Sequence, residues 1–277
     1  MYKLRDWIDE SKLTDYISSN PKAIRMLEKR PDLIDWQTLS ENPEAIHLLE
    51  ANQDKIDWRW LSINPSAIHL LTQNPDKINW NTLSRNPEAI HLLEANQDKI
   101  NWKWMSSNPG ALKLLETNPD KMVHKNLSSN PKGIHLLKDI DWSNLSMNPG
   151  AIKILEANPD KIEWNCLSIN EKALHILEEN LDKIDWFLLS INTGAISLIE
   201  KNLDKINWVL LSENPSAIHI LEEHKENIVW DVFSKNHAIF EYDYQAMKEK
   251  TSIFVEELMA NRFHPKNIDK FESWGFI

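Results

Sequence analysis

A unit of 22 residues recurs along most of this 277-residue chain. Units this short cannot bury an apolar face alone and must stack on their neighbours, so the period predicts a solenoid rather than a globular core. Every step is 22 residues except one of 18, and the asparagine that marks the register lies two residues after a serine at Asn20, Asn42, Asn64, Asn86, Asn108, Asn130, Asn148, Asn170, Asn192, Asn214 and Asn236.

The first half of a unit predicts a helix of two to three turns. In the unit that contains Asn86-Pro87, apolar side chains follow at Ala89, Ile90 and Leu93, which is helical spacing. The asparagine side chain can cap free backbone N–H groups, and proline is well tolerated at the first helical position. A second asparagine about ten residues later is expected to end this helix in a left-handed conformation.

The second half of a unit predicts a shorter helix. In Ile-Asn-Trp-x-x-Leu-Ser, Trp80 and Leu83 are three residues apart, so both are expected to face the core. The residue before the tryptophan is placed to cap the helix. Strands are not expected, because no segment shows sustained alternation. The capping residues are Asp35, Asp57, Asn79, Asn101, Asp141, Asp185 and Asn207.

These patterns predict an all-α solenoid of about ten or eleven two-helix repeats. We expect an N-terminal cap over 1–13, the array over 14–237 and a C-terminal helical cap over 238–277. With stacked helices roughly 8–10 Å apart, the array would be a curved rod on the order of 100 Å long. The short step and the replacement of a tryptophan by His124 suggest an irregularity near 118–142 that divides the rod into two segments.

Composition narrows the possible partners. The net charge of −11 disfavours nucleic acid, since phosphate binding requires a basic stripe. No apolar run approaches the roughly 20 residues that span a bilayer, and no signal peptide is evident. Cys166 is the only cysteine, which excludes a disulfide framework. We therefore expect a soluble protein in the cytoplasm, with no membrane partner.

Catalysis is not expected. The serine and asparagine rows occur in every unit, which indicates capping and backbone hydrogen bonding rather than one asymmetric active site. Glycine-rich phosphate loops, Gly-x-Ser-x-Gly and His-Glu-x-x-His are absent from the sequence. The sequence therefore predicts no enzyme, no catalytic residues and no cofactor.

A histidine row on the longer helices includes His47, His69 and His91. Successive members would lie roughly 8–10 Å apart, whereas zinc ligands lie about 2 Å from the ion, so no metal site is expected. The favoured interpretation is a solvated helix face on which His47 pairs with Glu50 and His91 with Glu94. The alternative is a row that contacts a partner and becomes positive in mildly acidic solution.

The positions that differ between units are the candidates for binding. Trp60 and Trp104 stand where other units have residues such as threonine, and each follows a cation, Arg59 or Lys103. Aromatic and arginine side chains dominate interface hot spots, although half-buried packing between units is an equally weighted alternative. A second apolar cluster, which could accept the C-terminal cap or a second subunit, consists of Phe187, Leu188, Val209 and Leu210.

The unit Asp-Trp-x-x-Leu-Ser-x-Asn-Pro-x-Ala-Ile-x-Leu-Leu-Glu resembles the tryptophan-containing repeat of uncharacterised proteins from giant, nucleocytoplasmic large DNA viruses. The resemblance covers roughly Leu13 to Asn236, and the tail from Met259 to Phe276 is similar to a C-terminal segment of such proteins. It implies no catalytic residues. The expected function is an interaction scaffold for a host or viral protein, with a structural role in the virus particle as the alternative and nucleic-acid binding disfavoured.

Overall fold

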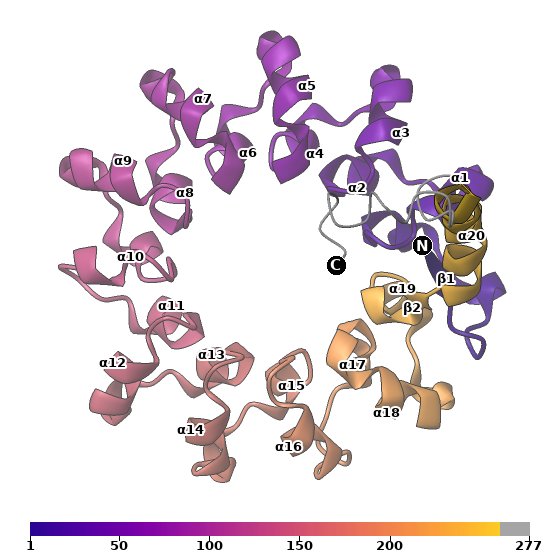
Figure 1. Cartoon of the computed structure of the whole chain (residues 1–277). Coiled ribbons are helices and arrows are strands. Elements are labelled where there is room, and N and C mark those ends of the chain that lie inside the picture. Colours follow the sequence, from indigo (N-terminus) through magenta and orange to yellow (C-terminus); the bar gives the residue numbers. More distant parts are fainter. Residues whose placement is uncertain (261–277) are drawn as a thin grey trace, which may run out of the picture. The chain divides into compact units, whose positions relative to one another are not determined.

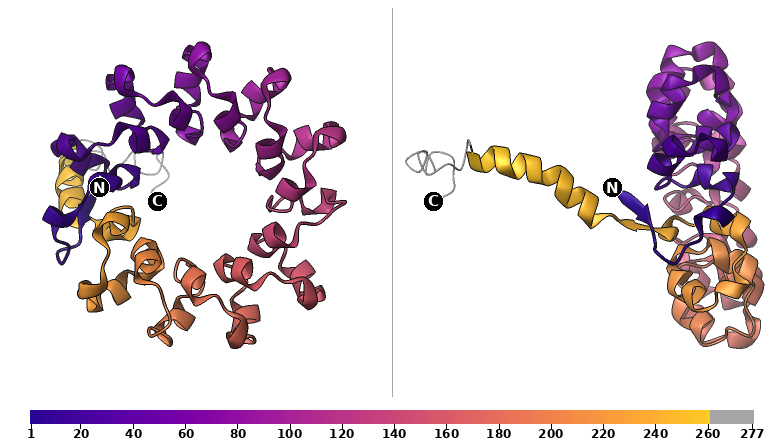
Figure 2. Two further views of the ribbon diagram at one scale, coloured as in Figure 1. Left: turned by 180° about the vertical axis from the view of Figure 1, so that it is seen from behind. Right: turned by 90° about the vertical axis from the view of Figure 1, so that its right-hand side faces the viewer.

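The computed structural model describes residues 1–260, which fold mostly into short helices. They group into two compact units, Trp7–Ile239 and Met1–Asp6 together with the segment that begins at Phe240. In the larger unit the helices form an inner and an outer row around a ring (Figure 1). This ring is flat when viewed edge-on (Figure 2). The predicted all-α repeat solenoid is confirmed.

The inner row contains the helices that begin at the repeat tryptophan. A 3₁₀ turn at Asp15–Ser19 contacts the first of them and starts the row. The helices are α2 (Trp36–Glu41), α4 (Trp58–Leu61), α6 (Trp80–Leu83), α8 (Trp102–Ser107), α10 (His124–Leu127), α11 (Trp142–Met147), α13 (Trp164–Ile169), α15 (Trp186–Leu189), α17 (Trp208–Glu213) and α19 (Trp230–Phe233).

The outer row contains the helices that follow each Asn-Pro pair or its equivalent. They are α1 (Ile24–Lys29), α3 (Ile46–Ala51), α5 (Ile68–Gln73), α7 (Ile90–Glu94), α9 (Leu112–Thr117), α12 (Ile152–Ala157), α14 (Leu174–Glu178), α16 (Ile196–Glu200) and α18 (Ile218–Glu223). A further 3₁₀ turn that the sequence analysis did not anticipate connects most outer helices to the next inner helix, as at Pro75–Lys77.

The seven predicted caps of the inner helices are confirmed. The Asn79 Oδ1 atom, for example, accepts a hydrogen bond from the Thr82 backbone N–H at 3.1 Å and so satisfies a free donor at the start of α6. The other six caps accept equivalent bonds. Three inner helices, α10, α13 and α19, follow Val123, Glu163 and Val229, and these cap positions make no such side-chain bond.

The second asparagine of each unit ends the outer helix in a different way from the one predicted. Asn74 has a φ of −129°, so its backbone is not left-handed. Its side-chain amide instead donates to the Leu70 carbonyl oxygen at 3.0 Å. The free carbonyl in the last turn therefore accepts from a side-chain amide. In a left-handed cap it would accept from a backbone N–H instead.

The core of the ring is made of the short apolar side chains of each unit. Leu83, Ala89 and Leu93 are fully buried, and so are their equivalents in the other units except Leu137 of the shortened unit, which is half-buried. The tryptophans are not: Trp80 and the other repeat tryptophans are half-buried. The prediction that tryptophan and leucine face the core together is therefore wrong for tryptophan.

A ladder of buried asparagines joins each repeat to the one before it. The Asn86 amide nitrogen donates to the carbonyl oxygens of Ser62 at 3.2 Å and Asn64 at 3.0 Å. Its Oδ1 atom accepts from the Glu88 N–H at 3.0 Å, as predicted for a cap. One buried side chain thus caps its own turn and satisfies two carbonyls of the preceding repeat, where unpaired groups would be costly.

The repeat serine links each unit to the following one. The Ser84 hydroxyl donates to the Trp80 carbonyl oxygen at 2.8 Å and accepts from the Asn101 N–H at 3.0 Å. Because Asn101 belongs to the next inner helix, this hydroxyl fixes where that helix starts. The structural roles predicted for the serine and asparagine rows are confirmed.

The same ladder closes the ring. The Asn20 amide donates to the carbonyl oxygens of Ser234 at 3.3 Å and Asn236 at 3.1 Å, so the first repeat stacks on the last one. The Lys12 ammonium also lies 5.0 Å from the centre of the Trp230 ring. The expectation of an open rod is therefore wrong, because the terminal repeats cover one another.

One residue at this closure has an altered acidity. His237 replaces the proline that follows the ladder asparagine in most units. Burial and, after it, the positive charge of Lys22 lower the pKa of this imidazole. Lys22 belongs to the first repeat, so the shift arises across the closure.

The shortened unit keeps its place in the ring. Its outer helix is reduced to a 3₁₀ turn at Ile134–Leu136. Asn148 still donates to the carbonyl oxygens of Ser128 at 2.9 Å and Asn130 at 3.2 Å. The missing residues therefore come mainly from the outer row, and the ladder continues through 118–142 without separating the solenoid into segments.

The smaller unit contains the only β-structure among residues 1–260, a pair of strands that the sequence analysis did not expect. β1 (Tyr2–Leu4) pairs antiparallel with β2 (Phe240–Tyr242), and the Tyr2 and Tyr242 rings stack 5.1 Å apart. Helix α20 (Tyr244–Ala260) follows and is capped by Asp243, which accepts from the Ala246 N–H at 2.9 Å. The C-terminal tail that resembles viral proteins lies almost entirely outside the described residues. No described helix is both long and apolar enough to cross a membrane.

Candidate binding face of the ring

The exposed residues of the inner row share one helix face. In α6 and just after it, Asn81 and Arg85 are exposed, whereas Leu83 and Ser84 are buried. Residues four apart lie on the same side of a helix, so the exposed pair faces away from the buried pair. Because the buried side packs toward the outer row, the exposed side forms the inner face of the ring (Figure 1).

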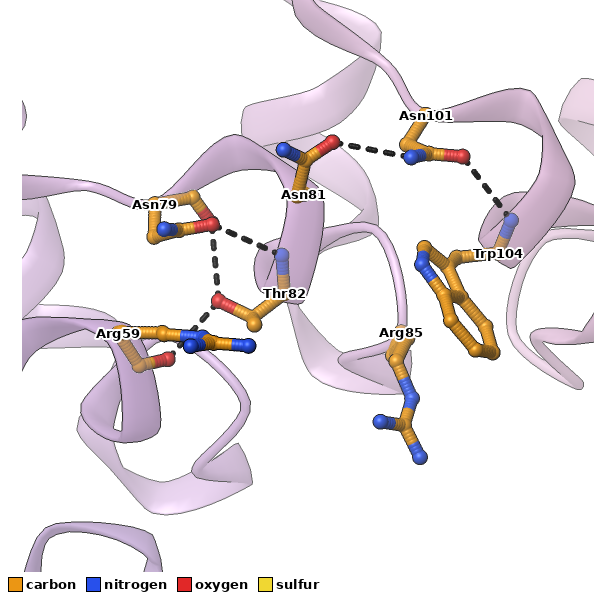
Figure 3. A pocket seen from close by; sticks show the side chains of 7 residues that line it. All are labelled: Arg59, Asn79, Asn81, Thr82, Arg85, Asn101 and Trp104. Carbon is orange, nitrogen blue, oxygen red and sulfur yellow. Dashed lines mark hydrogen bonds between the residues drawn. The ribbon is translucent and has the colours of Figure 1, made fainter. Parts of the chain in front are cut away.

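Three consecutive inner helices, α4, α6 and α8, form a pocket of about 440 Å³ on this face (Figure 3). Arg59 and Arg85 extend on either side of Thr82, and the Trp104 indole lies beside Arg85. The structure therefore brings together two of the predicted partner-binding residues, Arg59 and Trp104. The pocket lining comprises Arg59, Asn79, Asn81, Thr82, Arg85, Asn101 and Trp104.

Cations gather on the Trp104 ring. The Arg85 guanidinium carbon lies 4.8 Å from the ring centre, and the Lys103 ammonium lies 5.7 Å from it. Both distances are within the range of cation–π attraction. Arg85 was not among the predicted residues, although it varies between units: the equivalent positions hold Ile63 and Ser107.

Trp60 is half-buried and does not line this pocket. In some other units the equivalent residue forms a side-chain hydrogen bond to the preceding repeat. The Thr82 hydroxyl donates to the Arg59 carbonyl oxygen of the preceding repeat at 2.8 Å, and the Asn144 amide donates to the Lys125 carbonyl oxygen at 3.0 Å. Trp60 and Trp104 replace this hydrogen-bonding side chain by a half-buried indole, and Trp104 contacts Arg85 of the preceding repeat.

The apolar cluster predicted at Phe187 and Val209 lies on the same inner face. These two side chains are 54% and 44% exposed, whereas Leu188 and Leu210 are half-buried. The patch extends to the two preceding inner helices, where Met147 and Ile169 are also exposed. Sequence reasoning missed these two residues because they occupy the position before the ladder asparagine rather than the one after the tryptophan.

The histidine row lies on the outer helices, and its pairing differs from the predicted one. The His47 Nε2 atom is 2.9 Å from Glu28, and His69 Nε2 is 2.7 Å from Glu50. Each histidine thus pairs with the glutamate of the preceding repeat, not with one on its own helix. His91 lacks this partner because Thr72 stands at the corresponding position. The row is exposed and strengthens the stacking only weakly.

The lysines of the connecting turns have a contact that the sequence analysis did not foresee. The Lys99 ammonium lies 4.5 Å from the centre of the Trp80 ring, and Lys77 lies 4.6 Å from that of Trp58. The lysine of one repeat therefore covers the half-buried tryptophan of the preceding repeat. Similar contacts recur at Trp36, Trp164 and Trp186.

The described residues include one cysteine and no candidate metal-ligand cluster. Within residues 1–260, no three His, Cys, Asp or Glu side chains are placed to hold a metal ion. Burial, and then the negative charges of Glu163 and Asp141, raise the pKa of the Cys166 thiol. A raised pKa disfavours the thiolate, which is the nucleophilic form.

Comparison with known proteins leaves the inner face as the main guide to function. No family model, curated protein or solved structure matches this chain.

Proposed function

We propose that this protein is a non-catalytic scaffold that binds a protein partner on the inner face of its ring. The observation that carries the proposal is that recurring and variable residues occupy different places in each repeat. Leucine, alanine, serine and asparagine recur and build the core and the ladder. The residues that differ most between units lie in the inner row, where many of them, such as Arg59, Arg85 and Phe187, are exposed.

The chemistry of the inner face changes around the ring in a way that suits one asymmetric partner. Arg59, Arg85 and Lys103 give one arc a positive charge, and Phe187 and Val209 are part of an apolar arc. Arginine and aromatic side chains supply most of the energy at protein interfaces. Charge complementarity then sets the orientation of the partner.

A nucleic-acid ligand is disfavoured by the same distribution. The chain carries a net charge of −11, and the inner positions beyond the positive arc include Glu41, Glu213 and Asp231. A phosphate backbone following the inner face would meet these carboxylates. A protein segment with separate acidic and apolar parts avoids that repulsion.

The resemblance to giant-virus repeats supports a place in viral infection, with the ring acting in the host cytoplasm on a host or viral protein. The alternative is a structural component of the virus particle. Mass spectrometry of purified particles separates the two, because a structural component must be present in stoichiometric amounts. A second copy bound at the apolar arc is a further alternative, and sedimentation of the purified protein would reveal that dimer.

The test of the binding face is the double variant Trp60→Thr/Trp104→Thr. Threonine already occupies the equivalent positions 38 and 82, so the fold should remain nearly unchanged. Affinity for a partner identified by crosslinking should fall about 30-fold or more, as expected for two hot-spot residues. His47→Ser/His69→Ser on the outer row is the matched control. A lower melting temperature with unchanged affinity would show that the tryptophans are packing residues and contradict the proposal.

A further inference from the structure

We infer that the pocket between α4, α6 and α8 is a carboxylate-binding site that receives an acidic segment of the protein partner. This inference rests on the proposed scaffold function, since it assigns a ligand to part of the same inner face. It depends on three features of the pocket: its free hydrogen-bond donors, its cations that form no ion pair, and the half-buried Trp104 ring on one side.

Each amide oxygen that lines the pocket already accepts one hydrogen bond. Asn79 Oδ1 accepts from the Thr82 N–H at 3.1 Å, and Asn101 Oδ1 accepts from the Trp104 N–H at 3.3 Å. Asn81 Oδ1 accepts from the Asn101 side-chain amide at 2.9 Å. These bonds leave the amide nitrogens of Asn79 and Asn81 as donors. A pocket with unbonded amide donors, and amide oxygens that each already accept one bond, favours a ligand that only accepts hydrogen bonds.

The two guanidinium groups are available to such a ligand. Arg59 and Arg85 take part in none of the ion pairs found within residues 1–260, whereas Arg30 pairs with Glu10 and Asp32. Arginine binds carboxylates through paired, charge-assisted hydrogen bonds. An acidic side chain between Arg59 and Arg85 would therefore complete the positive side of the pocket.

Size and surroundings favour a peptide over an isolated ion. The volume of about 440 Å³ exceeds that of one carboxylate and lies in the range of ligand pockets. The Trp104 ring offers an apolar surface for the stem of a glutamate side chain. In an extended peptide, alternate residues lie roughly 6–7 Å apart, so acidic residues at i and i+2 can approach neighbouring repeats.

The test measures binding of fluorescein-labelled hexaglutamate by fluorescence anisotropy, with hexaglutamine as the uncharged comparison. The intact protein should bind hexaglutamate in preference to hexaglutamine. Arg59→Gln/Arg85→Gln should weaken binding roughly 10- to 100-fold, because it removes two charge-assisted contacts. Lys113→Gln/Lys153→Gln is the matched control, since it removes the same charge from exposed positions of the outer helices and should have little effect.

Several outcomes would overturn the inference. Equal binding of the two peptides by the intact protein would remove the carboxylate preference, and equal loss in the two double variants would indicate only a general charge effect. If a decathymidine oligonucleotide binds more tightly than hexaglutamate, and this binding depends on Arg59 and Arg85, the ligand of the pocket is a nucleic acid rather than a peptide. A partner that depends on Trp60 but not on the arginine pair would overturn the pocket assignment while the scaffold function stands.

Discussion

At the scale of single residues, the repeat tryptophan and the repeat leucine have different roles although both recur with the same period. Leu83 is fully buried between the rows. Trp80 is half-buried, and its exposed side is covered by Lys99 at 4.5 Å. The aromatic ring therefore bridges two repeats at their surface. Spacing alone could not distinguish this arrangement from full burial, because both require an apolar side chain at the same position.

These roles predict different costs of truncation. Leu83→Ala should lower the free energy of unfolding by about 2–5 kcal/mol, since it leaves a cavity in a closed core. Lys99→Gln should lower it by only about 0.5–1 kcal/mol, the range of an exposed cation–π contact. Urea unfolding followed by circular dichroism measures both. A cost at Lys99 equal to that at Leu83 would show that the lysine–tryptophan contacts, rather than the leucine core, hold the repeats together.

At the scale of the helices, most of the fold was predictable because its signals are local. The spacing of apolar residues and the Asp or Asn before each tryptophan correctly located the outer and inner helices and their caps. The pocket was predicted only in part, since Arg59 and Trp104 differ between units in an obvious way but their grouping with Arg85 depends on how adjacent repeats stack. The partners of His47 and Lys99 are likewise in neighbouring repeats, and sequence spacing within one unit cannot reveal them.

Inner helix α13 lacks a side-chain cap from the residue before its tryptophan and so tests whether that residue stabilises these helices. It begins after Glu163, whose longer side chain makes no capping bond, whereas Asp141 caps α11 by accepting from the Asn144 N–H at 2.9 Å. Glu163→Asp keeps the charge and should stabilise the protein by about 0.5 kcal/mol, the low end for a cap, because the Asn165 Oδ1 atom already accepts from the Cys166 N–H at 2.9 Å. Glu163→Gln is the control without a short acceptor. An unchanged or lower melting temperature for Glu163→Asp would contradict the capping argument.

At the scale of the ring, closure depends on a small rotation between successive repeats. The eleven repeats marked by the ladder asparagines complete one turn, so each contributes about one-eleventh of it. This rotation arises from side-chain packing between units and leaves no local signal in the sequence. The sequence contained one indication of closure. Asn20 is the first ladder asparagine and has no earlier repeat in the chain, yet it is still an asparagine, the residue that bonds to a neighbouring repeat.

Closure makes a specific prediction for that residue. In a closed ring, Asn20 makes three hydrogen bonds: two to the carbonyl oxygens of Ser234 and Asn236, and one from the Lys22 N–H at 3.0 Å. Asn86 in the middle of the array makes the same set. Asn20→Ala and Asn86→Ala should therefore each lower the free energy of unfolding by about 3 kcal/mol, because each removes three hydrogen bonds and leaves one buried serine carbonyl, that of Ser234 or Ser62, without a donor.

An open array would give a different result. Without a preceding repeat, Asn20 would retain only the local bond from Lys22, and its replacement would cost about 1 kcal/mol, as for an ordinary helix cap. Asn86→Ala would still cost about 3 kcal/mol, because its neighbours are present in either arrangement. The ratio of the two costs, measured in the same denaturant titration, thus reports ring closure directly. A cost at Asn20 close to that at Asn86 requires the last repeat to lie against the first.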